Sequence, residues 1–203
     1  LYVPQDDRPV SLQYTVDTAR EAGMTILTPP QNLISGKNYQ GQADQIMAWV
    51  EQNAGRADVM VLSTDTLIYG GLVDSRKHNI PLSTLESRLK RIEGLKARHK
   101  NVRIYGFGTV MRSPRASGGG TEPAYYAEYG PTIFQIAALQ DKLDSGALTQ
   151  EETQKLMSLQ ASVPVEYLQD WFDRRQKNMK INKELIDETR SGVFDYFALG
   201  HDD

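Results

Sequence analysis

The chain has no cysteine among its 203 residues, which excludes disulfides, thiolate zinc sites and a cysteine nucleophile. Only three histidines are present, and their positions give no Ser-His-Asp order that would indicate a catalytic triad. The 23 lysines and arginines do not outnumber the 26 acidic residues, and no apolar run approaches the roughly 18 residues of a membrane span. We therefore expect neither a nucleic-acid partner nor a membrane span.

Hydrophobic residues make up 39% and charged residues 24% of the chain, a balance typical of a soluble globular protein. No signal peptide is visible, so the sequence leaves the compartment open between the cytoplasm and export. The chain starts inside an expected strand and ends on Asp202-Asp203, where a loop is expected to begin. We therefore expect the N-terminal segment of a longer protein, with the remainder of its own chain as a partner.

Short apolar runs alternate with helical patterns along the sequence. Strands are expected at residues 1–4, 24–27, 59–62, 102–107 and 196–199. Helices are expected from Pro9, with Asp7 or Arg8 near the cap, to Gly23, and then at about 46–50, 85–95, 123–129, 131–144, 150–160 and 165–190. This order predicts one α/β domain over residues 1–203, with a mostly parallel sheet of about five strands and a helical insertion at about 122–190.

Two architectures fit this order of elements. The favoured one is an open, three-layer, Rossmann-like sheet with helices on both faces, which five strands can build at this length. The alternative is the first part of an incomplete (β/α)8 barrel, because a complete barrel needs about 250 residues. In both, the loops after the strands gather at one edge, and we expect the site there.

Acidic residues follow three of the expected strands: Asp6 and Asp7, Asp65, and Asp202 with Asp203. Carboxylates at strand ends can bind a metal, act as acid and base, or hold sugar hydroxyls. Each also has a structural interpretation. Asp7, Asp65 or an acid of the last pair would cap a helix, and Asp6 would pair with Arg8.

Other polar or small residues stand near the same strand ends. Tyr69 precedes Gly70-Gly71, where the backbone can approach a ligand or form a simple turn. Arg112 follows the fourth expected strand and suits bidentate anion binding, or an ion pair with Asp65 or Asp6. His78 stands in an exposed-looking context.

The long helix after Pro164 carries polar residues within an apolar stripe. The stripe consists of Leu168, Trp171, Phe172, Met179 and Ile186. Arg175, Asn178 and Asn182 fall within it and need partners, because an unpaired buried polar group costs about 1–3 kcal/mol. We expect either hydrogen bonds to the neighbouring strand ends or contacts with a polar ligand.

Several stretches resemble the bacterial DUF4127 family along the whole chain, in order. They are 3–10, 28–30, 63–73, 107–112, the run Arg175-Gln176-Lys177-Asn178 with Asn182, and Asp202-Asp203. Gln5 stands where the family pattern leads us to expect an aliphatic residue. Family members are longer than this chain, and the resemblance implies no particular activity.

Our leading hypothesis is a hydrolase that acts on a carbohydrate or polyol. The candidate catalytic or metal-binding residues are Asp6, Asp7, Asp65, Asp202 and Asp203. The candidate substrate-binding residues are Tyr69, Gly70, Gly71, Arg112, Arg175, Asn178 and Asn182. One alternative is a hydrolase of phosphate or amide bonds that depends on Mg²⁺, Mn²⁺ or Ca²⁺, and another is a non-catalytic sugar-binding or scaffold module.

Overall fold

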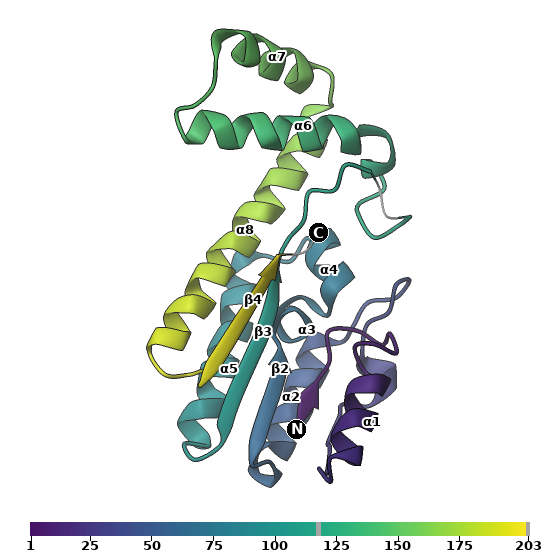
Figure 1. The fold of residues 1–203 in the computed structure, drawn as a ribbon, viewed down its shortest axis with the longest axis vertical. Helices are drawn as coiled ribbons and strands as arrows, with labels where there is room; N and C mark the ends of the chain where they lie inside the picture. Colours follow the sequence, from purple (N-terminus) through teal and green to yellow (C-terminus); the bar gives the residue numbers. More distant parts are fainter. Residues whose placement is uncertain (117–118, 202–203) are drawn as a thin grey trace.

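The protein contains a parallel sheet whose strands pair in the order of the sequence (Figure 1). The structure is a computed structural model that describes residues 1–116 and 119–201. Within these residues the strands are β1 (Tyr2–Val3), β2 (Val59–Ser63), β3 (Arg103–Val110) and β4 (Tyr196–His201). Every neighbouring pair is parallel. The predicted α/β class with a parallel sheet is therefore confirmed.

The described residues form four strands rather than about five, because segment 24–27 makes no strand pairing. Its backbone contact with the sheet is one hydrogen bond, from Tyr2 N to the carbonyl of Leu27 at 2.8 Å. Pro29 and Pro30 follow almost at once, and proline has no N–H to extend a ladder. The segment therefore runs beside β1 without joining it.

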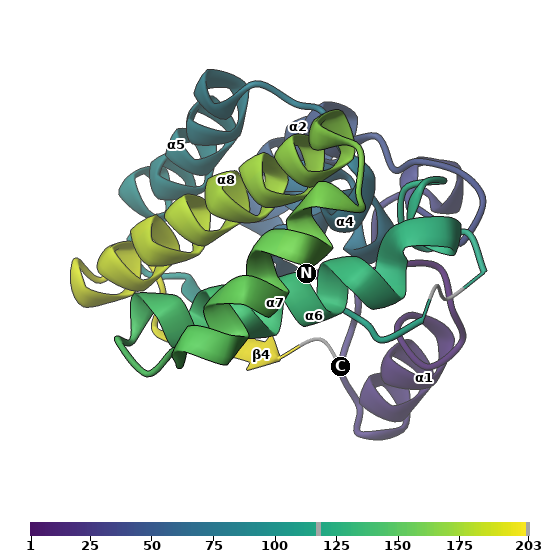
Figure 2. The ribbon, with the colours of Figure 1, turned by 90° about the horizontal axis from the view of Figure 1, so that it is seen from above.

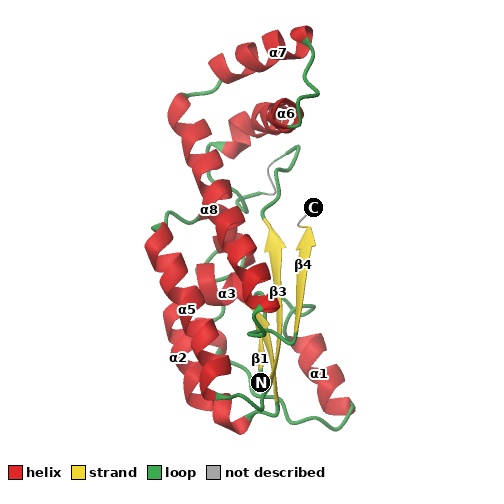
Figure 3. Ribbon diagram, turned by 90° about the vertical axis from the view of Figure 1, so that its left-hand side faces the viewer, coloured by secondary structure: helices red, strands yellow, loops and turns green. Residues whose placement is uncertain are grey.

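Helices lie on both sides of this sheet. Along one face run α2 (Ala43–Asn53), α5 (Leu82–Arg98) and α8 (Val165–Arg190), whereas α1 (Gln13–Glu21) lies on the other side near β1 (Figures 2 and 3). The sequential strand order lacks the reversal found at the switch point of a doubly wound sheet, and it is also the order of strands in a barrel. The strand order is thus compatible with the barrel alternative.

The main core lies between the sheet and the helices on its more covered face. Met60, Leu62 and Ile104 alternate along β2 and β3 and are completely buried. They pack in one cluster with a stripe of α5 that consists of Leu85, Leu89, Ile92 and Leu95. This stripe is the one that the helical spacing predicts.

Helix α1 begins at Gln13 rather than at Pro9, and the expected cap from Asp7 or Arg8 is wrong. The N–H groups of Ser11 and Leu12 both donate to the carbonyl of Arg8 at 2.9 Å, so residues 8–12 form turns before the helix. The Asp7 side chain instead accepts a hydrogen bond from the Tyr39 hydroxyl.

Two short helices follow β2 directly: α3 (Thr64–Tyr69) and α4 (Leu72–Lys77). Between β3 and β4, α6 (Tyr126–Asp144) and α7 (Gln150–Ala161) precede α8. The helices expected at 123–129 and 131–144 form the single helix α6, which continues through Pro131 because Tyr126, Ile133 and Ile136 on either side of it are buried. With Trp171 these residues form a second, smaller core. Helices α6 and α7 stand beyond the carboxyl ends of the strands (Figures 1 and 3).

No helix in the described part of the chain is both long and apolar enough to cross a membrane.

The main core gives a direct test of the fold. Replacing Ile104 with alanine should lower the free energy of unfolding by about 2–5 kcal/mol, because the side chain is completely buried and a cavity would remain. Ile186→Ala is the matched control, since this isoleucine on α8 is 38% exposed and should cost much less. Urea unfolding of both variants measures the difference, and equal losses would contradict the described core.

Candidate functional site

The carboxyl ends of the strands lie at one edge of the sheet because all the strands are parallel. In the ladder Val3 pairs with Leu62, Ser63 with Phe107, and Val110 with His201. The segments that follow these strands therefore start at the same edge. Asp202 and Asp203, which follow β4, lie outside the described residues.

Asp65 joins the ends of three strands. Its side chain is buried, and its carboxylate accepts a hydrogen bond from Gln5 Nε2 at 2.9 Å and another from Thr109 Oγ1 at 2.9 Å. Gln5 follows β1 and Thr109 belongs to β3, whereas Asp65 lies in the first turn of α3 after β2. Ser63 is the residue that caps α3, by accepting a hydrogen bond from Thr66 N. Asp65 is therefore not the cap of this helix.

The two acids after β1 have different environments. Asp6 is buried and forms an ion pair with Arg8, with both Nε and Nη2 of the arginine 2.8 Å from the carboxylate. Asp7 is half-buried, its N–H donates to the carbonyl of Ser35 at 2.9 Å, and its carboxylate accepts from the Tyr39 hydroxyl. Asp6 thus stabilises the turn, and the Asp7 carboxylate has a tyrosine rather than a cation as its hydrogen-bond donor.

Gly70 and Gly71 form the turn between α3 and α4. Gly70 ends α3 with φ +112°, a conformation that side chains other than glycine rarely adopt. A Cβ on Gly71 would lie 1.8 Å from Ser35 Oγ, so the close neighbour here is protein. Tyr69, just before them, has a buried hydroxyl with no hydrogen-bond partner in the described part of the chain. Burial, and then the negative charge of Asp65, raise the pKa of this hydroxyl, which therefore stays protonated.

Arg112 pairs with a carboxylate that the sequence analysis did not identify. Its Nε donates to Glu122 Oε1 at 3.0 Å, whereas the predicted alternatives were an anion or an ion pair with Asp65 or Asp6. The Glu122 side chain is completely buried, and Arg76 Nη1 on α4 lies 3.7 Å from the same oxygen. This cluster fixes the segment after β3 against α4.

On α8, Asn178 and Asn182 bind the protein itself. Asn178 Nδ2 donates to the carbonyl of Ser75 at 2.8 Å, and Asn182 Nδ2 donates to the carbonyl of Thr109 at 3.2 Å. Arg175 donates to the carbonyl of Met111, just beyond β3. These three residues therefore contact the strand end and α4. Of the two interpretations, hydrogen bonds to the strand ends and contacts with a ligand, the structure shows the first. Arg175 also has further N–H donors beyond the one that binds Met111.

The buried face of α8 differs from the predicted stripe. Trp171, Ile181 and Leu185 are buried, whereas Met179 is 42% and Ile186 is 38% exposed. The prediction that Met179 and Ile186 face the core is wrong, because the three polar side chains turn the buried face toward the ends of the strands.

His78 is buried rather than exposed. Its ring stacks on that of Tyr69, with the centroids 4.9 Å apart. Nε2 lies 2.8 Å from Asn178 Oδ1, and Nδ1 accepts a hydrogen bond from Ile80 N at 3.2 Å. These partners fit the neutral ring with its proton on Nε2. Burial lowers the pKa of His78 from 6.5 to about 4.

Among residues 1–116 and 119–201, no three His, Cys, Asp or Glu side chains are grouped so as to hold a metal ion. The Mg²⁺, Mn²⁺ or Ca²⁺ of the alternative hypothesis stays a prediction.

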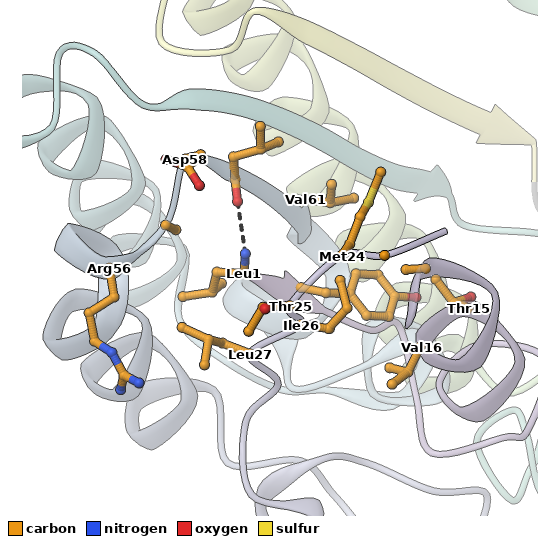
Figure 4. Close-up of a pocket in the computed structure, with 15 residues that line it drawn as sticks. Leu1, Thr15, Val16, Met24, Thr25, Ile26, Leu27, Arg56, Asp58 and Val61 are labelled. Carbon is orange, nitrogen blue, oxygen red and sulfur yellow. Dashed lines mark hydrogen bonds between the residues drawn. The ribbon is translucent and has the colours of Figure 1, made fainter. Parts of the chain in front are cut away.

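A groove of about 610 Å³, shown in Figure 4, has none of the candidate site residues in its lining. It runs between α1 and the strands β1 and β2, and its walls include Tyr2, Val16, Leu27 and Val61. The walls are mostly apolar. A reactive site requires polar groups that converge on one point, and this groove has few of them. The polar strand ends are therefore the better candidate for chemistry.

Several residues at the carboxyl edge of the sheet, namely Gln5, Thr109 and Glu122, were not among the predicted site residues. Gln5 had a signal, because a polar side chain stood where an aliphatic one was expected. Thr109 carried no periodic pattern, and Glu122 sits in an irregular segment, so only the folded chain brings each of them to its partner.

The family described as "Protein of unknown function (DUF4127)" matches residues 1–203, which is the whole chain and confirms the resemblance. No curated protein and no solved structure matches it.

The buried neutral His78 predicts a loss of stability at mildly acid pH. Its pKa is lower in the folded than in the unfolded chain, so between pH 6.5 and about 4 the unfolded state binds more protons. The contribution of His78 is complete above pH 6.5 and decreases as the pH falls, by up to about 3 kcal/mol. In His78→Gln this part of the pH dependence should disappear, as measured by urea unfolding at pH 7, 5.5 and 4.5. Parallel curves for the two proteins would contradict the buried neutral ring.

Proposed function

Because the chain belongs to the DUF4127 family, which is described without an activity, we propose its function from the site. The proposed function is that of a hydrolase that acts on a carbohydrate or polyol at the carboxyl ends of the strands. Open parallel sheets and barrels both place their sites at this edge.

The observation that carries the proposal is the position of Asp65. Burying a carboxylate destabilises the folded chain unless the carboxylate is paired or hydrogen-bonded. Here donors from the ends of β1 and β3 hold it in one orientation, at 2.9 Å each. A carboxylate held rigidly at the meeting point of three strand ends is suited to acid–base chemistry on a bound substrate.

Hydrolysis of a glycosidic bond usually requires a second carboxyl group. We assign this role to Asp7, which is half-buried and whose carboxylate accepts from the Tyr39 hydroxyl. Asp6 forms an ion pair with Arg8 and stabilises the turn that contains Asp7. Asp202 and Asp203 remain candidates for the same edge.

The buried hydroxyl of Tyr69 supports the proposal that a polar ligand binds at this edge. A buried hydroxyl without a partner costs about 1–3 kcal/mol, and a substrate hydroxyl or a water molecule would remove this cost. Asn178 and Asn182 would act on the substrate indirectly, by holding α4 and the end of β3.

The test is turnover of a panel of glycosides by the wild type, Asp65→Asn and Asp7→Asn. Loss of a catalytic carboxylate should lower kcat/KM at least about 100-fold in each variant. Asp187→Asn is the control, because this aspartate is exposed near the end of α8 and should leave turnover unchanged.

Circular dichroism of each variant separates lost chemistry from lost structure. Unchanged turnover in both folded variants would remove Asp65 and Asp7 from the mechanism. Binding of sugars without any turnover by the wild type would instead indicate a non-catalytic sugar-binding module.

A further inference from the structure

Arg175 differs from the other arginines near the ends of the strands. Its neighbour Arg174 is almost completely buried, and its partners are Asp170, at 2.7 and 2.9 Å, and the carbonyl of His78, at 2.7 Å. Arg112 and Arg76 share the buried Glu122. Arg175 has no carboxylate within ion-pair distance in the described residues, and its hydrogen bond goes to the carbonyl of Met111.

The guanidinium of Arg175 is partly shielded from solvent. The side chain is half-buried, and burial lowers the pKa of its guanidinium, with only the hydroxyl of Tyr126 acting in the other direction. A guanidinium has five N–H donors in a fixed fork. One backbone carbonyl leaves most of these donors for another acceptor.

Arg175 lies close to the proposed catalytic edge. Met111, which it contacts, is two residues beyond Thr109, the residue that binds Asp65. Two residues of extended chain span roughly 7 Å, so the Met111 carbonyl that Arg175 contacts lies about this far along the chain from Thr109, which binds Asp65. One substrate of modest size can reach both.

Two further features make this place suited to an anion. Burial and then Glu122 raise the pKa of the Tyr126 hydroxyl, and the charges of Arg175 and Arg112 oppose this rise, so both cations lie within electrostatic reach of this hydroxyl. Ser113, next to Arg112, has a buried hydroxyl without a hydrogen-bond partner in the described part of the chain. A hydroxyl and a guanidinium fork are complementary to an oxyanion.

We propose that the substrate is an anionic sugar or polyol, and that Arg175 and Ser113 bind its carboxylate or phosphate group. This inference deepens the proposed function and rests on it for the identity of the reacting site. Arg175 then determines specificity, while the carboxylates at the strand ends perform the chemistry.

The test measures binding rather than turnover. The 203-residue chain is titrated by calorimetry with glucuronate, glucose 6-phosphate, inorganic phosphate and neutral glucose. We expect an anionic sugar to bind more tightly than glucose, and Arg175→Met to weaken its binding at least about tenfold while glucose binding stays unchanged. Arg175→Lys, which keeps the charge, should give an intermediate loss.

The two sugars also distinguish the anion. Preference for glucuronate indicates a carboxylate and preference for glucose 6-phosphate indicates a phosphate, and either supports the proposal. Arg190→Met is the matched control, because the Arg190 side chain is 76% exposed and its loss should not change binding.

Three outcomes would overturn the inference. They are failure of the wild type to bind any anionic probe, equal weakening of glucose and anion binding in Arg175→Met, and unchanged anion binding in that variant. None of these concerns Asp65, so a hydrolase of neutral glycosides would survive them. Conversely, anion binding that depends on Arg175 with no role of Asp65 in turnover would reject only the proposed catalysis.

Discussion

The arrangement of residues at the carboxyl edge of the sheet depends on the buried carboxylate of Asp65. Left without donors, it would cost several kcal/mol of stability, so the chain must bring hydrogen bonds to it. Gln5 supplies one from the end of β1, and Thr109 supplies another from β3. The ends of three strands are therefore held at one point, and any ligand at this edge meets a fixed arrangement.

The helices between β3 and β4 are also tied to the carboxyl edge of the sheet by hydrogen bonds. Asn182 on α8 binds the carbonyl of Thr109, and Arg175 binds that of Met111, so α8 holds the chain where it leaves β3. Met111 in turn packs in the small core with Tyr126 and Trp171. The position of α6 and α7 over the carboxyl edge is thus coupled to the strand that holds Asp65.

Periodicity predicted the elements that local pattern controls, such as α5 with its apolar stripe and the parallel strands β2 and β3. It failed where tertiary contacts compete with local preference. Asp7 and Arg8 do not cap α1, because residues 8–12 form turns and the helix begins only at Gln13. For the site, the sequence indicated the edge of the sheet but not which residues pair with one another there. The buried Glu122 lies within ion-pair distance of Arg76, and the buried His78 contacts Asn178, and both partners are far away along the chain.

A double-mutant cycle between Asp65 and Thr109 tests the central claim most directly. Asp65→Ala, Thr109→Val and the double variant are compared by urea unfolding, since valine keeps the shape of threonine but removes its hydroxyl. If the carboxylate joins the strand ends, the two changes should couple by about 1–3 kcal/mol. Additive losses, with a coupling near zero, would show that Asp65 does not hold β3 and would contradict the account.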